Sequence, residues 1–151
     1  MKVLIIIGSE TDRPVMQESQ NYLGYFGIEN ELLVASAHRT PDKVRKAALE
    51  AKNNGFGVVI TAAGMAAALP GVVAAYTSLP VLGVPLEGGL PGGIDALYSI
   101  VQMPPGLPVG TLAVGKAGAR NAAIMAARIL ALENKTVAEK LEAFKQNGYR
   151  L

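Results

Sequence analysis

The sequence predicts a single α/β domain in which a doubly wound parallel sheet of about five strands lies between layers of helices. Short apolar runs rich in β-branched residues alternate along the chain with segments of helical period. The apolar runs are continuous rather than alternating, which is typical of strands buried on both faces of a parallel sheet. Right-handed crossover connections would then place helices on both sides. These observations favour a flavodoxin-like three-layer sandwich with an additional C-terminal helix.

Five strand–helix units are expected in chain order. The strands are expected at residues 3–7, 32–34, 58–61, 81–84 and 109–114. The helices that follow them are expected at residues 15–26, 44–51, 69–76, 94–101 and 119–132. A last amphipathic helix, residues 136–146, begins with a capping-box-like sequence at Thr136 and is expected to pack on a neighbour or on the domain's flank. Residues 1–151 thus form one domain, with a core at 1–132 and a helical extension at 133–151.

Two helix starts are marked by capping residues. Asp12 precedes Pro14 and Thr40 precedes Pro41, so each polar residue can cap a helix with proline in its first turn. In an open parallel sheet, ligands bind beyond the carboxyl ends of the strands. Both helix starts follow such strand ends, and the function is therefore expected there.

The composition excludes several classes of function. The chain has 151 residues, a net charge of +2 and no clustered Lys or Arg, which argues against a nucleic-acid binder. With no cysteine and a single histidine, disulfides, thiolate chemistry and a histidine-based metal cage are excluded. The N-terminal apolar run stops at Gly8, so it is neither a signal peptide nor a membrane span. We expect a cytoplasmic protein with a small-molecule partner and no metal.

Polar side chains gather in the loops after the first two strands. Ser9 and Thr11 follow Gly8, and the next helix offers free amides to an anion. Ser36 and Arg39 can each hold a phosphate, arginine through two parallel hydrogen bonds. The first loop matches neither GxxxxGK nor GxGxxG, and capping alone would explain its serine equally well. Together the two loops predict a phosphate site.

His38, the only histidine, lies between Ser36 and Arg39. Histidine titrates near neutral pH, so it suits proton transfer at a strand end. A helix-terminal or interface histidine satisfied by a hydrogen bond is the structural alternative. The phosphate-binding neighbours favour a catalytic role.

The carboxylates are less informative. Asp12 can bind vicinal ribose hydroxyls, cap its helix, or do both. Glu87 and Asp95 flank a glycine-rich loop, where Asp95 is expected to cap the next helix. Lys116, between small residues, is expected to be a surface cation.

The order of motifs closely resembles that of class I PurE, the carboxyaminoimidazole ribonucleotide mutase family of purine biosynthesis. The resemblance covers about residues 3–132. It is carried by GSETD at 8–12, SAHRTP at 36–41, AAGMAAALPG at 62–71, PVLGVP at 80–85, SIVQMPPGLPVGT at 99–111 and AGARNAAIMAARIL at 117–130.

This resemblance implies an enzyme that moves a carboxyl group from an exocyclic nitrogen to a ring carbon of an aminoimidazole ribonucleotide, without metal, nucleoside triphosphate or organic cofactor. It also implies carbon dioxide as an intermediate and a homo-octamer whose sites are built from adjoining subunits. The implied site residues are Ser9, Ser36 and Arg39 for the phosphate, Asp12 for the ribose, His38 for the proton, and Gly64 and Ala66 for the carbon dioxide pocket.

The third loop departs from the family pattern. Met65 stands where glycine is usual and Ala68 where a second histidine is usual. Arg13 replaces a customary tryptophan, and residues 87–89 differ from the customary polar loop. Class II relatives also lack the second histidine, and AGMAAALP is similar to the PurE-like domain used in nickel-pincer cofactor synthesis. Two alternatives therefore stay open: a carboxylase that captures free carbon dioxide on this or another nucleotide, and a non-catalytic nucleotide-binding paralogue with a structural His38.

Overall fold

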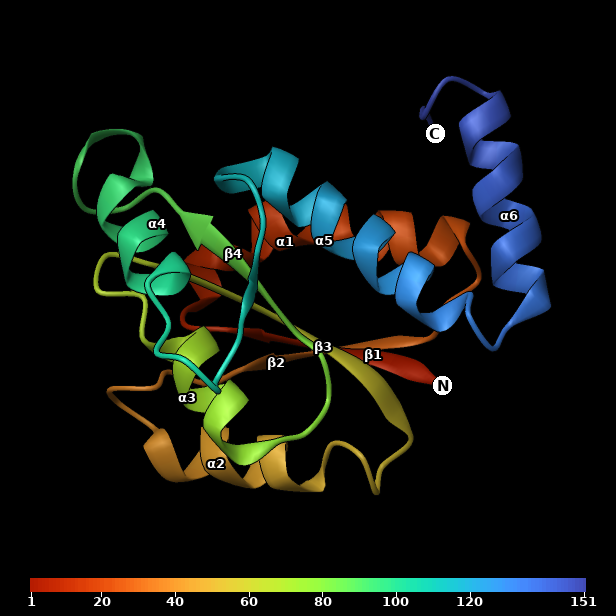
Figure 1. The fold of residues 1–151 in the computed structure, drawn as a ribbon. Helices are drawn as coiled ribbons and strands as arrows, with labels where there is room; N and C mark the ends of the chain where they lie inside the picture. The colour runs from red at the N-terminus through yellow and green to blue at the C-terminus, as the bar shows by residue number, and fades with distance from the viewer.

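Helices cover both faces of a five-stranded parallel sheet in the computed structural model, which describes residues 1–151 (Figure 1). The strands are β1 (Lys2–Ile7), β2 (Asn30–Val34), β3 (Phe56–Gly64), β4 (Val81–Leu86) and β5 (Gly110–Thr111). The helices are α1 (Arg13–Tyr25), α2 (Pro41–Glu50), α3 (Leu69–Tyr76), α4 (Ile94–Val101), α5 (Gly115–Leu130) and α6 (Lys135–Gln146), with 3-10 turns η1 (Glu10–Asp12) and η2 (Pro91–Gly93). The predicted fold class is confirmed.

The strand order β2-β1-β3-β4-β5 places a topological switch point between β1 and β3. From β1 the chain runs through α1 to β2 at one edge, and then returns through α2 to β3 on the other side of β1. All paired strands are parallel, so their carboxyl ends meet at one edge of the sheet. Ligands of open α/β sheets bind in the crevice at such a point.

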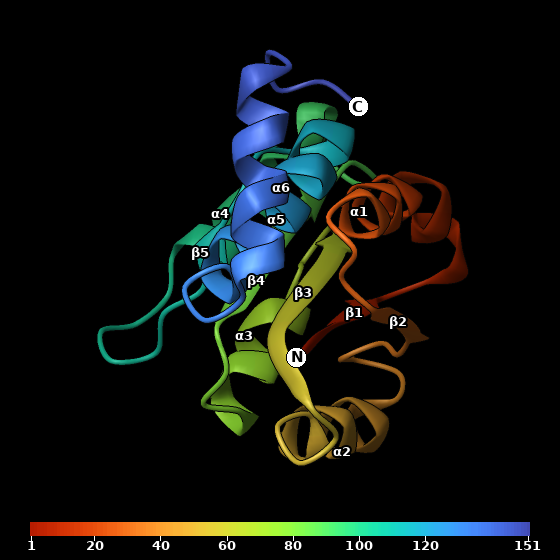
Figure 2. The same ribbon diagram turned by 90° about the vertical axis from the view of Figure 1, so that its right-hand side faces the viewer.

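Each face of the sheet has its own hydrophobic core. Helices α1, α5 and α6 enclose one core, and helices α2, α3 and α4 enclose the other. Figure 2 shows α1 and α5 on the face opposite to α2 and α3. The inward residues of β1 alternate between the two cores, with Ile5 in one and Ile6 in the other. This two-sided burial explains why the strand sequence is continuously apolar.

Small residues bring α5 close to its neighbours. Five of its alanines, from Ala119 to Ala127, are fully buried, and the Ser19 hydroxyl of α1 donates a hydrogen bond to the Ala119 carbonyl at 2.6 Å. A Cβ added to Gly118 would lie only 1.6 Å from the Ala113 carbonyl oxygen, so glycine is required there. The alanine-rich sequence therefore serves close packing within the chain.

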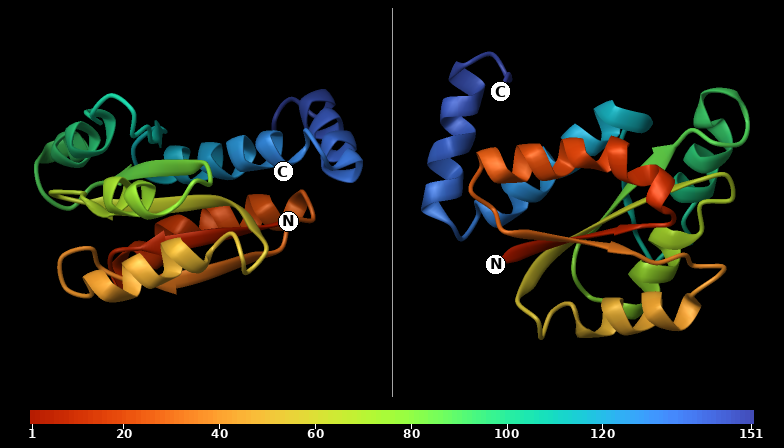
Figure 3. Two further views of the ribbon diagram at one scale, coloured as in Figure 1. Left: turned by 60° about the horizontal axis from the view of Figure 1, so that its bottom comes forward. Right: turned by 180° about the vertical axis from the view of Figure 1, so that it is seen from behind.

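Helix α6 packs on the flank of the α1–α5 layer (Figure 3). Val137 and Phe144 of this helix are buried. The Phe144 ring contacts Tyr22, Phe26 and Tyr149 in an aromatic cluster. No helix in the structure is long and apolar enough to cross a membrane.

Two strands differ from the predicted ranges by four residues or more, and the other three by one or two residues. Strand β3 spans Phe56–Gly64 instead of residues 58–61, because it pairs with β1 on one side and β4 on the other. Strand β5 is reduced to Gly110–Thr111 instead of residues 109–114, because its pairing with β4 is limited to Leu82 and Gly83. Long-range pairing, which the local pattern does not contain, decides both lengths.

Two capping predictions, for α6 and α2, are wrong in detail. Helix α6 is capped by Asn134, whose side chain accepts from the Val137 amide at 3.2 Å, so Thr136 lies inside the helix. Thr40 occupies the N-cap position of α2, but its hydroxyl bonds Ser36 rather than an α2 amide. Helix α6 begins one residue earlier than expected, so Asn134 takes its N-cap position.

Asp12 and Asp95 also cap differently from expectation. Asp12 makes no capping bond to α1, because it is the last residue of the additional turn η1, and its Oδ2 accepts from the Ser9 amide at 3.0 Å. Asp95 lies within the first turn of α4 rather than before it, and Gly93 takes the N-cap position. The Asp95 carboxylate instead accepts from the Leu90 amide at 3.0 Å.

Candidate active site

A cleft of about 580 Å³ opens at the carboxyl edge of the sheet, where the loops after β1, β2, β3 and β4 meet. It lies at the switch point between β1 and β3. The structure brings every predicted site residue to this one cleft: Ser9, Asp12, Ser36, His38, Arg39, Gly64 and Ala66. Their individual roles stay predictions.

The first loop is held by its own side chains. The Ser9 hydroxyl accepts from the Thr11 amide at 3.3 Å and from the Thr11 hydroxyl at 2.9 Å. The Asp12 carboxylate closes the loop through the Ser9 amide. Ser9 and Asp12 form a capping box on η1, so the hydroxyl and the carboxylate have fixed places in the cleft.

The second loop is tied both to itself and to the first loop. The Ser36 hydroxyl accepts from the Arg39 amide at 3.2 Å, and the Thr40 hydroxyl donates to the Ser36 carbonyl at 3.1 Å. The Arg39 guanidinium donates to the Gly8 carbonyl at 3.3 Å. A cation and two hydroxyl-bearing loops therefore converge, which suits an anion such as a phosphate.

His38 stands at the exposed turn between Ser36 and Arg39. Its imidazole makes no hydrogen bond or ion pair within the chain, although each of its loop neighbours does. A histidine held for structure would be expected to have a partner. Both ring nitrogens are instead free to meet a ligand in the cleft.

Burial raises the pKa of Asp12, and the Ser9 amide and the Arg39 charge oppose the rise. Desolvation dominates because the half-buried carboxylate faces the cleft wall. Within the chain the carboxylate accepts the Ser9 amide alone. Hydroxyl donors of a ligand would add hydrogen bonds to the ionised form and so lower its pKa.

The third loop gives the cleft an apolar wall. After Gly64 the backbone makes two tight turns, in which the Ala67 amide donates to Met65 at 2.9 Å and the Ala68 amide to Ala66 at 2.7 Å. A Cβ added to Gly64 would lie 3.2 Å from the Leu86 carbonyl oxygen, which shows how closely the neighbouring strand end approaches. The side chains that this loop offers to the cleft carry no polar atoms other than the Met65 thioether.

Several lining residues were missed or weighed lightly in the sequence. Ala37, Leu69 and Gly88 line the cleft without a chemical group that could have signalled them. Glu87 lines the cleft and makes no ion pair, whereas Asp95 and Lys116 lie outside it. The position of Glu87 directly after a strand end was the available signal.

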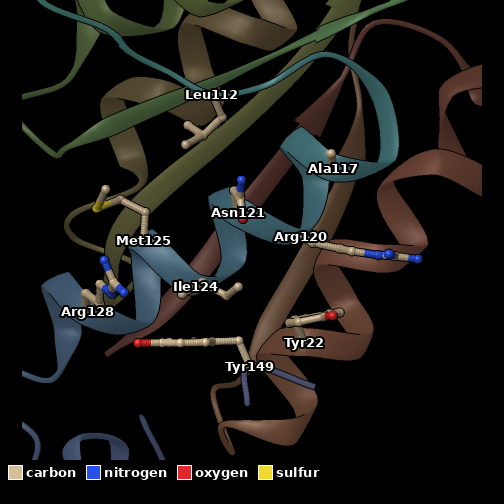
Figure 4. Close-up of a pocket in the computed structure, with 9 residues that line it drawn as sticks. All are labelled: Tyr22, Leu112, Ala117, Arg120, Asn121, Ile124, Met125, Arg128 and Tyr149. Atoms are coloured by element: carbon tan, nitrogen blue, oxygen red, sulfur yellow. The ribbon is translucent and has the colours of Figure 1, made fainter. Parts of the chain in front are cut away.

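A second cleft of about 510 Å³ lies over α5, between α1 and the C-terminal segment (Figure 4). Its Arg120 forms an ion pair with Glu18 of α1 at 2.9 Å. Tyr149 lies beside Arg128 at the other end of the cleft. None of the predicted site residues lies here. No group of three or more His, Cys, Asp or Glu side chains in the structure could hold a metal ion.

The family model of AIR carboxylase matches residues 2–150. The chain is 52% identical over 145 residues to an N5-carboxyaminoimidazole ribonucleotide mutase of Vibrio vulnificus, covering 96% of this chain and 90% of the relative. It is 48% identical to the protein of that name from Escherichia coli K12, covering 96% and 86%. The crystal structure of Treponema denticola PurE superposes with a TM-score of 0.88 at 28% identity, covering 97% of this chain and 90% of that one.

Proposed function

The chain belongs to the AIR carboxylase family, and we propose that it converts N5-carboxyaminoimidazole ribonucleotide to 4-carboxy-5-aminoimidazole ribonucleotide in the cleft at the carboxyl edge of the sheet. The observation that carries this mutase activity is the division of the cleft, with an unpartnered His38 between anion-binding loops on one side and an apolar wall facing them. A charged ribonucleotide whose base exchanges a neutral molecule of carbon dioxide fits both sides.

The polar loops would hold the sugar phosphate. Ser9, Ser36 and Arg39 offer hydroxyl and guanidinium donors to the phosphate, and their loops are linked through the bond from Arg39 to Gly8. Asp12 would accept from the ribose hydroxyls, because its half-buried carboxylate has one hydrogen bond within the chain, from the Ser9 amide. Binding the remote phosphate and ribose in this way fixes the base against the third loop.

The reaction then needs one shuttled proton. Cleavage of the bond between the exocyclic nitrogen and the carboxyl carbon releases carbon dioxide, and the nitrogen takes a proton from His38. The enamine-like ring carbon attacks the carbon dioxide, a carbon–carbon bond forms, and the ring carbon's proton returns to His38. No proton is consumed overall. Positioned acid–base groups of this kind contribute about 10²–10⁴-fold in rate.

Carbon dioxide would remain beside the third loop between the two steps. The methyl groups of Ala66 and Ala68 suit a neutral, weakly hydrogen-bonding molecule better than water. Holding it next to the ring carbon makes the second step effectively unimolecular. The cleft thus requires no cofactor for this chemistry.

One observation supports a second candidate, a carboxylase that takes free carbon dioxide. Ala68 lines the cleft with a methyl group where the resemblance leads one to expect a second imidazole. An apolar pocket at that position would accept dissolved carbon dioxide as well as a molecule released in place. The free imidazole of His38 argues against a paralogue that only binds nucleotide.

A homo-octamer is part of the same proposal. Exposed apolar side chains on α4 and on the loop before it support an interface between subunits at this surface. Leu90 is 58% exposed and Tyr98 is 61% exposed. Val101 on the same helix is 47% exposed. The cytoplasmic location that the sequence predicts stays a prediction.

Two parallel assays test the proposal. One supplies purified protein with the N-carboxylated ribonucleotide, the other with aminoimidazole ribonucleotide plus bicarbonate, and both follow the ring-carboxylated product. Rapid product only in the first assay is expected of a mutase. Product in the second at low bicarbonate would instead establish the carboxylase. If neither assay gives product while calorimetry still detects ribonucleotide binding, both activities are contradicted.

A further inference from the structure

Met65 occupies an unfavourable position at the mouth of the cleft. Its backbone is left-handed, with φ of 56°, a conformation that glycine adopts freely and a residue with a long side chain does not. Burial within the chain contributes little stability, because Met65 is 60% exposed there. Neither core packing nor backbone preference explains a methionine here. Strained residues that persist tend to serve a site, and this one lines the candidate active cleft.

The side chain of Met65 spans two loops. A Cβ added to Gly89 would lie 3.3 Å from Met65 Cγ, so the methionine reaches from the loop after β3 to the loop after β4. Its target is anchored, because Asp95 accepts from the Leu90 amide at 3.0 Å. Gly89 leaves room for both neighbours, since its added Cβ would also collide with the Asp95 carboxylate. Met65 therefore closes one side of the cleft by bridging to a fixed loop.

Met65 covers the part of the cleft that is lined by methyl groups, with Glu87 after β4 as the charged side chain beside it. Ala66 and Ala68 follow it in the third loop and line the same space. The hydrogen-bonding side chains of the first two loops belong to the opposite side. A flexible thioether over methyl groups makes a cover that excludes water and keeps a small neutral molecule inside.

We infer that Met65 is a positioning residue that retains the carbon dioxide released from the substrate nitrogen until the ring carbon captures it. The inference rests on the proposed mutase function. Cleavage of the nitrogen–carbon bond frees carbon dioxide, and formation of the carbon–carbon bond consumes it, with the proton passing through His38. Met65 touches neither bond, and its effect is on whether carbon dioxide escapes between the two steps.

The test measures escape directly. Protein receives unlabelled N-carboxylated ribonucleotide in buffer that contains ¹³C-bicarbonate and carbonic anhydrase. Free aminoimidazole ribonucleotide and ¹³C in the ring-carboxylated product both report escaped carbon dioxide, after subtraction of the enzyme-free background. Wild-type protein is expected to give mainly unlabelled product. Met65→Gly is expected to raise the escaped fraction several-fold while keeping its fold, because glycine adopts the left-handed conformation without strain.

Matched variants separate the cover from other effects. Met65→Leu keeps the apolar bulk and is expected to behave like the wild type. In Met65→Asn, asparagine tolerates the left-handed conformation but is polar. We expect its escaped fraction of carbon dioxide to rise as in the glycine variant. Met125→Ala removes another exposed methionine, 39% exposed in the cleft over α5, and is expected to change nothing.

The possible outcomes are distinguishable. An unchanged escaped fraction in Met65→Gly and Met65→Asn overturns the inference, and so does an equal rise in Met65→Leu or Met125→Ala. Wild-type product that carries full label also overturns it, because carbon dioxide is then not retained at all. A wild-type protein that yields no ring-carboxylated product contradicts the proposed function instead, before any variant is compared.

Discussion

The polar and apolar halves of the cleft are built in different ways. In the polar half, side chains bond the backbone of their own loops, as Ser9 does with Thr11 and Ser36 with Arg39. In the apolar half, order comes from the backbone itself, through tight turns and the left-handed Met65. Substitutions in the polar half should therefore remove single interactions. Substitutions in the apolar half should act through the shape of the wall.

Replacement of His38 should have the largest effect and separates chemistry from binding. In His38→Asn we expect kcat to fall about 10²–10⁴-fold, because the proton shuttle is lost while the phosphate and ribose contacts remain. Steady-state kinetics gives the rate and calorimetry the affinity for the ribonucleotide. Full activity in this variant would show that another group moves the proton.

Replacement of Arg39 should weaken ribonucleotide binding in the polar half of the cleft. Arg39→Lys keeps the charge and loses the planar fork, so we expect ribonucleotide affinity to fall about tenfold, in keeping with about 1.5–3 kcal/mol for a hydrogen bond to a charged group. Titration calorimetry measures the change. Arg13→Lys is the control, because that arginine is paired with Glu10 outside the cleft. An equal loss in both variants would mean that the effect is not local.

Ala68→His tests the apolar half of the cleft by adding a second imidazole to its wall. Ala68 precedes α3 with ordinary backbone angles, φ −70° and ψ −19°, and is only half-buried, so a histidine fits without backbone strain. We expect a folded protein with a mutase rate a few-fold higher, because a second imidazole enters the wall. Circular dichroism and the first of the two assays check both points. Loss of the fold would show that the loop is packed around alanine.

The smallest expected effect concerns stability against pH. The pKa of Asp12 is raised in the folded protein, so its contribution to the free energy of unfolding is intact below the ordinary value of 3.8 and falls as pH rises through the folded pKa. Asp12→Asn should therefore be slightly more stable than the wild type at neutral pH, and equally stable in acid. Its ribonucleotide affinity should fall, because the acceptor for ribose is weakened.

Asp95→Asn is the control of opposite sign. The Leu90 amide lowers the pKa of Asp95, so this carboxylate stabilises the fold above its ordinary pKa and loses that contribution as pH falls. Thermal melts of both variants from about pH 2 to about pH 8 check the two signs. This range covers the titration of ordinary carboxyl groups and of one whose pKa is lowered. Stabilisation of both variants at neutral pH would contradict the assignment.

Local pattern was sufficient for the order of elements and for the loops that carry polar chemistry. The apolar runs predicted all five strands, and the boundaries of α3 and α4 agree with the predicted residues 69–76 and 94–101. Buried strands and amphipathic helices owe their patterns to which face meets the core, so the sequence itself records them. The loop after β2 could be chosen as a site because His38 and Arg39 are chemically distinctive wherever they fold.

Only the tertiary structure decided what those residues contact. Asp12 bonds Ser9 because η1 adds a turn before α1, and β5 is short because only Leu82 and Gly83 of β4 pair with it. The left-handed Met65 and its reach towards Gly89 depend on how closely the ends of β3 and β4 approach. These features arise from contacts between segments distant in the chain, whose energies outweigh local preference, and no short stretch of sequence contains them.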